Sequence, residues 1–499
     1  MSLPYFPVVN HTIMMNFIEN VLCHFESCFS RKAAFRWFVT IIIGLMLRSD
    51  KLGVTSVIRD LALSPGCYDS MLHFFRASSW SLEEIRKRWF SAVRLYAPLY
   101  REGNYHVLVG DGVKQSKEGR RMPGVKKLFQ ESENSAKPEY IHGHMFGGLG
   151  ILAGSVRNWA CIPLSIRLHD GLQAAMEWKG ASVSEASHVV QMVEDAYRAA
   201  LTFGNSLLLL DRYFLTVPAL EKLKSLNGSG DVHMEIVTKA KKSCTAFERP
   251  GPRKPGRGRP AKKGAAVHLK ELFASRGGQF QKTEIELYGK RESIRYYCID
   301  LLWGQKLYQE LRFVLVEMNG VQGILASTSL ELDPLSIIRL YSYRFRIECT
   351  FRELKQQIGA FCYHFWSKYM PKLSYYQKKG EPTPMERVEG EKPRQKVLEA
   401  VRAIEMHMAL SCIAMGTVQC LSLRTEGKLH TEQIRYQRTP SKGKVSEGAM
   451  MHYLRKHIFR FMWQNPGLHI TRLIQEVQDQ SEICEDLLAS YAYKLFTLK

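Results

Sequence analysis

Three acidic residues are the best candidates for chemistry in this chain. Asp111 and Asp211 each close a hydrophobic run, and Glu348 lies in a segment rich in cations and aromatic hydroxyls. Hydrolysis or transfer at a phosphodiester needs an activated oxygen nucleophile and neutralisation of the charge that develops at phosphorus. Two Mg²⁺ ions held by hard oxygen ligands supply both. Carboxylates at the ends of two adjacent strands, joined by one from a helix packed across them, would meet that need.

The segment around Glu348 carries four chemically different groups at helical spacing. At about 100° per residue, Tyr341, Arg344, Glu348 and Lys355 fall at roughly 0°, −60°, −20° and −40° around a helix. One narrow face would therefore present a carboxylate flanked by two cations and an aromatic hydroxyl. That combination suits a divalent metal ion held beside a phosphodiester. An exposed helix with ordinary Glu–Lys pairing is the alternative interpretation.

The charge balance favours a polyanionic partner. The 499 residues include 70 Lys+Arg and 48 Asp+Glu, a formal net charge of +22, which favours nucleic acid over a membrane surface. The apolar stretch at 37–47 is too short to span a bilayer, and polar residues interrupt the one at 406–423, which predicts a buried core helix. The N-terminus has no secretory-signal pattern. Eleven scattered cysteines without a Cys-x-x-Cys pair favour the cytoplasm and argue against a disulfide framework or a zinc finger.

The elements that must position the acids follow from changes in the hydrophobic pattern. The first hundred residues have helical spacing. Strand patterns then occupy 105–111, 141–153 and 161–168, and a fourth follows an amphipathic helix, at 206–211. The first and fourth strands are apolar on both faces, so we expect them at the centre of a sheet. Asp170, after the third strand, is a rival acid, but Asp170-Gly171 is typical of a turn.

A different pattern interrupts this one between residues 223 and 333. It begins polar, passes through a basic Pro/Gly-rich segment at 249–263, and continues with alternating strand signals at 283–288, 293–300, 312–317 and 323–327. A helix is expected from about Leu335. A Lys/Pro/Gly-rich linker follows at 368–396, and the last hundred residues again have helical spacing.

These residues resemble the DDE transposases. Asp111-Gly after a first strand and Asp211-Arg-Tyr-Phe after a fourth resemble the first two acids of that group. The pattern Tyr-x2-Arg-x3-Glu-x6-Lys, complete at Tyr341, Arg344, Glu348 and Lys355, is similar to the signature of the bacterial insertion-sequence family four. The resemblance covers roughly residues 105 to 366. It implies a mixed α+β fold: a ribonuclease-H-like catalytic core with a mostly β insertion, flanked by α-helical N- and C-terminal domains.

On this resemblance the chain divides into five parts. They are a helical DNA-binding domain (1–100), the first part of the core (101–222), the β-rich insertion with its basic loop (223–333), the Glu-bearing helix of the core (334–368), and a linker with a helical C-terminal domain (369–499).

The resemblance also implies roles for the residues. Asp111 would bridge two Mg²⁺ ions, for which Mn²⁺ can substitute, and Asp211 and Glu348 would each complete one. The signature's Tyr341, Arg344 and Lys355 would bind phosphates at the transposon end. Water would nick one strand, the freed 3′-OH would attack, and a DNA hairpin would be closed and reopened before joining to target DNA. Phe345 and Trp303 are candidates to hold a flipped base.

The basic segment suggests a separate DNA contact. Arg257 and Arg259, in Arg-Gly-Arg-Pro, would fit an A·T minor groove, with a solvated basic loop as the alternative. The expected partners are double-stranded DNA, as terminal inverted repeats and as target, and a second copy of the chain, because two ends are cut together. No membrane partner is expected, and the expected location is the bacterial cytoplasm at the nucleoid. A ribonuclease-H-fold nuclease or resolvase without strand transfer, or a non-catalytic DNA-binding derivative, are the alternative functions.

Overall fold

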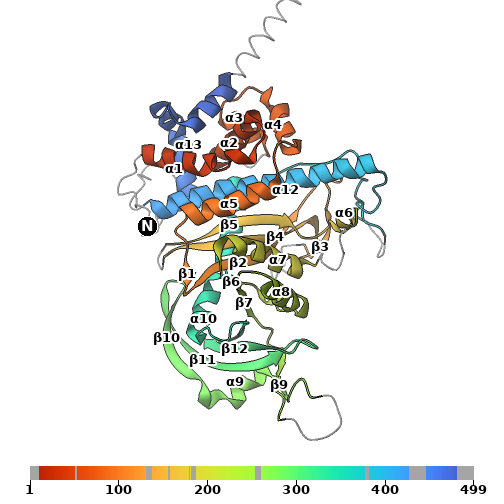
Figure 1. The fold of residues 1–499 in the computed structure, drawn as a ribbon, viewed down its shortest axis with the longest axis vertical. Coiled ribbons are helices and arrows are strands. Elements are labelled where there is room, and N and C mark those ends of the chain that lie inside the picture. Colours follow the sequence, from red (N-terminus) through yellow and green to blue (C-terminus); the bar gives the residue numbers. More distant parts are fainter. Residues whose placement is uncertain are drawn as a thin grey trace, which may run out of the picture.

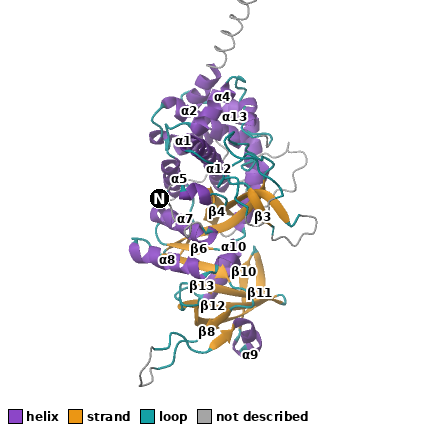
Figure 2. Ribbon diagram, turned by 90° about the vertical axis from the view of Figure 1, so that its right-hand side faces the viewer, coloured by secondary structure: helices purple, strands orange, loops and turns teal. Residues whose placement is uncertain are grey.

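The computed structural model describes residues 11–50, 53–130, 138–155, 158–178, 180, 187–252, 260–376, 381–425 and 445–479. The molecule is elongated, with three regions along its long axis (Figure 1). Helices from both ends of the sequence occupy one end, a sheet with helices on its faces lies in the middle, and curved antiparallel strands occupy the other end. The side view keeps the same order of regions (Figure 2).

The first helical region combines early and late parts of the chain. Its helices are α1 (His11–Cys23), α2 (Lys32–Leu47), α3 (Thr55–Asp60), α4 (Cys67–Arg76), α5 (Leu82–Tyr96), α12 (Glu391–Arg424) and α13 (Glu447–Gln464). α12 packs against α2, α4, α5 and strand β5 (Asn158–Leu168). Among the described residues it is the one helix long and apolar enough to cross a membrane, but its apolar window is entirely buried. The prediction of a buried core helix at 406–423 is confirmed.

The sheet contains both parallel and antiparallel strand pairs. The strands are β1 (Arg101–Glu102), β2 (Tyr105–Ser116), β3 (Lys126–Phe129), β4 (Tyr140–Ser155), β5, β6 (Ser206–Leu209), β7 (Met234–Lys239), β8 (Thr245–Phe247), β9 (Ala266–His268), β10 (Gln281–Leu287), β11 (Lys290–Trp303), β12 (Gln309–Met318) and β13 (Val321–Ser327). They pair in the order β3-β4-β2-β6-β7-β13-β12-β11-β8-β9, with β5 on β4, β1 on β2 and β10 on β11. The predicted first and fourth strands, β2 and β6, are neighbours and run parallel.

Helices cover both faces of the sheet at β2. Added side-chain atoms at Gly110 and Gly112 would meet Met192 and His188 of α7 (His188–Phe203). Asp111 alternates with these glycines and so faces the other way. On that side lie α10 (Pro334–Tyr343) and α11 (Arg346–Glu353), and α11 packs against β2 and β5. α8 (Val217–Ser229) packs beside α7.

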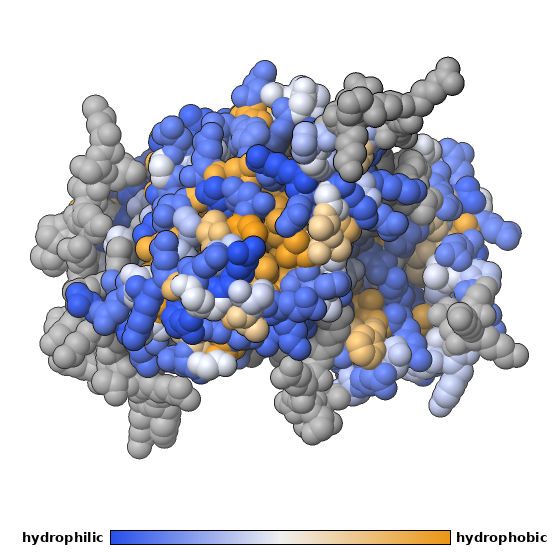
Figure 3. Space-filling model, turned by 90° about the horizontal axis from the view of Figure 1, so that it is seen from below, coloured by the Kyte–Doolittle hydropathy of each residue, from blue (hydrophilic) through white to orange (hydrophobic). Residues whose placement is uncertain are grey.

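The strand signals predicted within 223–333 correspond to β10, β11, β12 and β13. They form an antiparallel meander that curves around α10 (Figure 1). β13 pairs with β7, so the meander continues the sheet that contains β2 and β6. Seen from this end, apolar residues gather near the centre of a mostly hydrophilic face (Figure 3).

Candidate active site

Asp111 and Asp211 lie at the same level of two adjacent parallel strands. β2 pairs with β6 so that Val109 is opposite Leu209, and each acid comes two residues later in its chain. The backbone carbonyl of Asp211 accepts a hydrogen bond from Thr238 Oγ1 at 2.9 Å, which ties the end of β6 to β7. Because the two strands run parallel, both acids lie toward the same end of these strands, Asp111 within β2 and Asp211 just after β6.

β2 does not end at Asp111. The strand continues to Ser116, with Asp111 opposite Gly148 of β4. The expectation that the acid closes the strand is therefore wrong. The apolar run stops at residue 110, but backbone pairing with β4 continues, and hydropathy does not report such pairing.

The segment that carries the Tyr-Arg-Glu-Lys pattern is not one regular helix. α10 ends before Arg344, α11 begins after Phe345, and Leu354–Ile358 forms a π-helical turn. At the first junction the amide of Ile347 donates to the carbonyl of Arg344, three residues earlier. Such tightening, followed by the wider π turn, changes the angular spacing along the segment. The single stripe at uniform spacing is therefore wrong as geometry.

Arg344 joins two of the acids. Its Nη1 donates to Asp111 Oδ2 at 3.0 Å, and its Nη2 donates to Glu348 Oε1. The Arg344 side chain is 14% exposed, whereas that of Glu348 is 53% exposed. Glu348 in the first turn of α11 thus lies at the solvent-facing side of the pair, and Asp111 lies on the inner side.

The electrostatics of the site combine burial with close opposite charges. Burial raises the pKa of Asp111 to about 6, although Arg344 acts in the opposite direction. Burial by itself would lower the pKa of Arg344. Four neighbouring side chains with oxygen atoms have a larger effect, so the pKa of Arg344 is raised overall. Those side chains are Asp111, Tyr341, Glu348 and Asp211. Asp211 therefore acts on the same guanidinium as the other two acids, and the three belong to one cluster.

The three carboxylates suit a divalent cation by chemistry. In this structure, however, the Arg344 guanidinium is the cationic partner of Asp111 and Glu348. Among the described residues, no three His, Cys, Asp or Glu side chains are close enough together to hold a metal ion. The Arg344 guanidinium fills the space between Asp111 and Glu348. The carboxylate oxygens are the ligands that Mg²⁺ prefers, and a cation would favour ionised Asp111, whose pKa is raised by burial. By donor type, Asp111, Asp211 and Glu348 are the residues that could hold such an ion.

The two remaining residues of the pattern have different surroundings. Burial raises the pKa of Tyr341, Arg344 opposes this, and Asp211 and Asp111 add to it, so the tyrosine belongs to the cluster. Lys355 lies in the π-helical turn, with Nζ 5.5 Å from the centroid of the Phe361 ring. The structure therefore brings Tyr341 and Arg344 to the acids, and it places the Lys355 ammonium group near Phe361.

An aromatic residue that the sequence analysis missed lies beside the cluster. Tyr288 forms the turn between β10 and β11, has a positive φ of 54° and is 59% exposed. Its ring centroid is 5.8 Å from that of Phe345, which is 36% exposed. Trp303 lies at the far end of β11, where its indole N–H donates to Cys244 Sγ at 3.1 Å. Of the two aromatic candidates, only Phe345 borders the acids, and Tyr288 joins it.

A buried polar network supports the opposite face of the sheet. Asp195 of α7 accepts hydrogen bonds from Arg167 Nη1 at 2.7 Å, Arg198 Nη1 at 2.7 Å and His169 Nε2 at 3.0 Å. His169 Nδ1 is 2.8 Å from His188 Nδ1. The His188 ring lies against Phe214, in the turn after Asp211, with centroids 5.1 Å apart. The network thus ends against the segment that holds Asp211, and no sequence spacing signals it.

An apolar contact sets how closely α11 approaches the sheet. Gly148 lies opposite Asp111 on β4, and a Cβ there would meet the Phe351 ring at 2.5 Å. Phe351 belongs to α11, the helix that carries Glu348. The absence of a side chain on Gly148 lets the ring lie directly on the strand.

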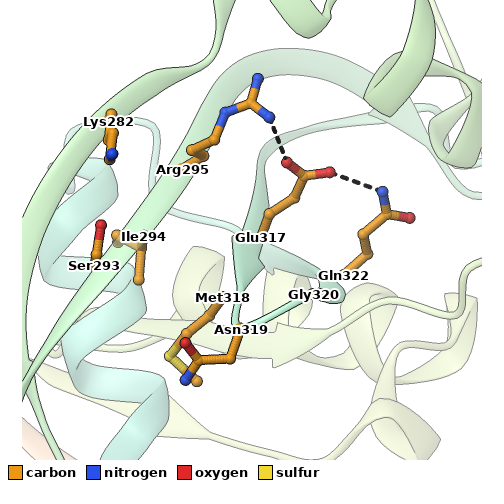
Figure 4. Close-up of a pocket in the computed structure, with 9 residues that line it drawn as sticks. All are labelled: Lys282, Ser293, Ile294, Arg295, Glu317, Met318, Asn319, Gly320 and Gln322. Atoms are coloured by element: carbon orange, nitrogen blue, oxygen red, sulfur yellow. Dashed lines mark hydrogen bonds and ion pairs between the residues drawn. The ribbon is translucent and has the colours of Figure 1, made fainter.

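Other candidates lie away from this cluster. Asp170 is in a turn, accepts from the Gly171 amide and pairs with Lys126 Nζ at 2.6 Å. Arg257 and Arg259 fall outside the described residues. A pocket of about 290 Å³ lies on the meander (Figure 4). It contains a row of paired side chains that crosses four strands and is formed by Lys282, Arg295, Glu317 and Gln322.

Comparison with known proteins identifies the family. The family of DDE superfamily endonucleases matches the chain over residues 24–286. The match covers more than half of the chain, includes Asp111 and Asp211, and ends before Glu348. No curated protein and no solved structure matches the chain. The chain belongs to the DDE superfamily endonucleases, which confirms the predicted DDE class, supports nuclease or transposase activity on DNA, and agrees with the divalent metals that this superfamily generally uses.

Proposed function

We propose that the chain is a DNA transposase that cuts the ends of its own insertion sequence and joins the 3′-OH to target DNA. The observation that carries this proposal is the cluster around Arg344. Two acids at one level of adjacent parallel strands and a third on the crossing helix act on a single guanidinium. Membership of the DDE superfamily supports the same conclusion.

In this proposal Asp111, Asp211 and Glu348 hold Mg²⁺, for which Mn²⁺ can substitute. Metal ions bound there supply an activated oxygen nucleophile and neutralise charge at phosphorus. The cluster's own contribution is position. Asp111 is fixed by the pairing of β2 with β4, Asp211 follows β6 and accepts a backbone hydrogen bond from Thr238, and Glu348 is fixed by the packing of α11 on β2 and β5. Rigid strands and a packed helix hold carboxylates more accurately than a loop would.

Arg344 has a double role in the proposal. In the DNA-free protein it neutralises Asp111 and Glu348. With DNA bound, its guanidinium would instead bind a phosphate at the cut end, a ligand that it can bind through two N–H groups. Tyr341 and Lys355 contact neighbouring phosphates. The exposed rings of Phe345 and Tyr288 contact each other. They provide stacking surfaces for a base displaced from the duplex.

The larger arrangement follows from the same proposal. The central sheet with Asp111 and Asp211 is the ribonuclease-H-like core at 101–222 and 334–368, and residues 223–333 are its β-rich insertion. The helical regions at 1–100 and 369–499 flank it, and the first binds the terminal inverted repeats. Arg257 and Arg259 contact a minor groove. Two copies of the chain synapse the two ends, in the bacterial cytoplasm at the nucleoid.

The test is cleavage of a supercoiled plasmid that carries the two ends of the element, with Mg²⁺, by the wild type and by Asp211→Ala. We expect cuts at both ends with the wild type alone, followed by joined products when target DNA is added. A denaturing gel separates hairpin ends from open ends. Cuts without joining would favour the nuclease or resolvase alternative.

One observation favours the non-catalytic alternative. Arg344 occupies the space between Asp111 and Glu348, as a structural ion pair would. If the pair is only structural, wild type and Asp211→Ala will bind the ends equally and neither will cut. Adding Mn²⁺ in place of Mg²⁺ to the same reactions completes the test, because failure with both metals would remove the proposed activity.

A further inference from the structure

A surface of aromatic and basic side chains lies on the strands β3 and β4. Lys127 pairs with His142, and Phe129 pairs with Tyr140, across the two strands. Cross-strand partners, and residues two apart on one strand, share a face, so these four side chains lie on one side of the sheet. The face ends at β3, which is an edge strand of the sheet path.

Close side-chain contacts connect these four residues to two others. Lys127 Nζ lies 4.4 Å from the Tyr140 ring centroid, and the Tyr140 and Phe129 rings are 5.4 Å apart. His142 lies 4.6 Å from Tyr375, whose ring is covered in turn by the Arg120 guanidinium at 4.7 Å. The set Lys127, Phe129, Tyr140, His142, Arg120 and Tyr375 is the β3–β4 surface.

The β3–β4 surface is open and its cations are held in place. Phe129 and Tyr140 are each 46% exposed and Tyr375 is 38% exposed, and Lys127 and Arg120 are exposed as well. A cation over an aromatic ring keeps its N–H groups available for another ligand. Two such cations beside exposed rings fit a polyanion, and the net charge of +22 agrees with one.

The β3–β4 surface lies on the same side of the sheet as the catalytic cluster. Asp111 is opposite Gly148 on β4, and Tyr140, His142 and Gly148 share one alternation of that strand. From Gly148 to His142 and Tyr140 is six to eight residues of β4, or about 20–26 Å at 3.3 Å per residue. Along duplex DNA this is about six to eight base pairs, at 3.4 Å each.

The face between the two places is covered by the segment after α11. The ring of Phe361 packs on Phe146 of β4 at 5.6 Å, and Lys355 Nζ lies 5.5 Å from Phe361. Lys355 therefore stands between the acids and the β3–β4 surface. Arg344, Lys355, Lys127 and Arg120 are thus cations in contact with residues of this face.

From this geometry we propose that the β3–β4 surface binds the backbone of double-stranded DNA about six to eight base pairs from the phosphate that is cut. The inference rests on the proposed function and names a second contact for the same substrate. Duplex DNA is stiff over this length, so a contact at the edge strand orients the helix axis relative to the acids. Lys127 and Arg120 bind phosphates, and Tyr140 and Tyr375 hold the two cations in position.

The experiment measures binding of the wild type and of Lys127→Ala/Arg120→Ala to two duplexes without metal, by fluorescence anisotropy. The long duplex, about 30 base pairs, extends beyond the β3–β4 surface on either side of the cut, and the short one, about 10 base pairs centred on the cut, does not reach it. We expect the double variant to bind the long duplex less tightly, with a salt slope smaller by about 1.8, which is two phosphate contacts. Its binding of the short duplex should match that of the wild type.

Matched variants separate the surface from general effects. Lys224→Ala removes an exposed lysine of α8, which packs with α7 on the other side of the sheet, and should leave both slopes unchanged. Lys127→Arg/Arg120→Lys keeps the charges and should restore the slope. An unchanged slope on the long duplex, an equal loss on both duplexes, or an equal loss on a single strand of the long sequence would overturn the proposal.

The outcome is distinguishable from that of the proposed function. In one case the wild type cuts with neither Mg²⁺ nor Mn²⁺, yet the double variant binds the long duplex less tightly than the wild type and Lys224→Ala do. This result would support the DNA contact at the β3–β4 surface and would contradict the transposase activity. If the wild type cuts and the double variant binds and cuts like it, the activity stands and the surface is wrong.

Discussion

Two carboxylates on opposite sides of the same sheet differ in how much positive charge surrounds them, and their pKa values shift in opposite directions. Asp195, on α7, is buried among two arginines and a histidine. Burial alone would raise the pKa of Asp195, but Arg167, His169 and Arg198 outweigh it and lower it. Asp111, on β2, shares one arginine with Glu348, and burial raises its pKa to about 6.

The difference separates a structural acid from a candidate ligand. Asp195 has the partners that its negative charge requires, so an added cation would improve nothing there. Asp111 is buried with too little positive charge around it, and it lies beside two other acids. An under-compensated carboxylate in such a cluster is the kind of group that a metal ion stabilises. Changes at the two acids should therefore have different consequences.

The largest expected effect is on cleavage. On the proposed function, Glu348→Ala should lower the rate of end cutting by about a thousandfold or more, because the loss of a metal ligand would cost several kcal/mol in the transition state. Gel assays of single-turnover cutting would measure it. Glu353→Ala, five residues later at the end of α11 and paired with Arg352, should cut normally. Equal loss in both variants would show that the helix, and not the carboxylate, was damaged.

The next effect is on stability at the structural acid. Asp195→Asn should lower the free energy of unfolding by about 1–3 kcal/mol, because Arg167 and Arg198, which are 27% and 51% exposed, lose their counter-charge and buried His169 loses a charged acceptor. Urea unfolding followed by circular dichroism would measure the change. The pKa of Asp195 is lowered on folding, so the advantage of the wild type is present above about pH 4 and shrinks as the pH falls further. A constant difference at all pH values would contradict the charge-based explanation.

Asp111→Asn should behave in the opposite sense. Its folded pKa is raised from 3.8 to about 6, so ionised Asp111 opposes folding without metal. The asparagine variant should be more stable than the wild type above about pH 6, by up to about 3 kcal/mol, and the gap should close below about pH 4. Unfolding curves in EDTA at several pH values would test this. A variant less stable than the wild type at pH 8 would mean that Asp111 is as well compensated as Asp195.

The smallest effects concern DNA affinity. Arg344→Ala and Lys355→Ala should each weaken binding to the element's ends and reduce the salt slope by about 0.9, one phosphate contact. Titrations at several salt concentrations would give the slopes. Arg352→Ala, which removes an exposed arginine of α11 paired with Glu353, provides the comparison. An unchanged slope for Arg344→Ala would leave Arg344 as the partner of Asp111 and Glu348 alone.

Much of the site's composition could be predicted from the sequence, because it depends on local patterns. Apolar runs located β2 and β6, and alternation located the meander from β10 to β13 within a few residues. The acids followed from those strands. The DDE class could be predicted from the residue types at 341–355 and from the order of the acids along the chain, without the three-dimensional structure.

The geometry around Arg344 could not be predicted, because it depends on backbone detail and distant partners. Nothing in the residue pattern distinguishes a regular helix from one with a tight junction at Arg344 and a π turn at 354–358. The contact of Arg344 with Asp111 joins residues 233 positions apart. Tyr288 was missed for a related reason, since only the folding of the meander brings its turn to Phe345.

The contact between Gly148 and Phe351 has a consequence for how such a chain can vary. A single methyl group on Gly148 would meet the Phe351 ring at 2.5 Å, so the ring, or α11 together with it, would have to shift. Because α11 also carries Glu348, the position of this acid depends on the missing side chain of Gly148. A larger residue at position 148 combined with a smaller one at position 351 would change the packing of α11 on the strand. Such paired substitutions could alter the activity without replacing any polar residue of the site.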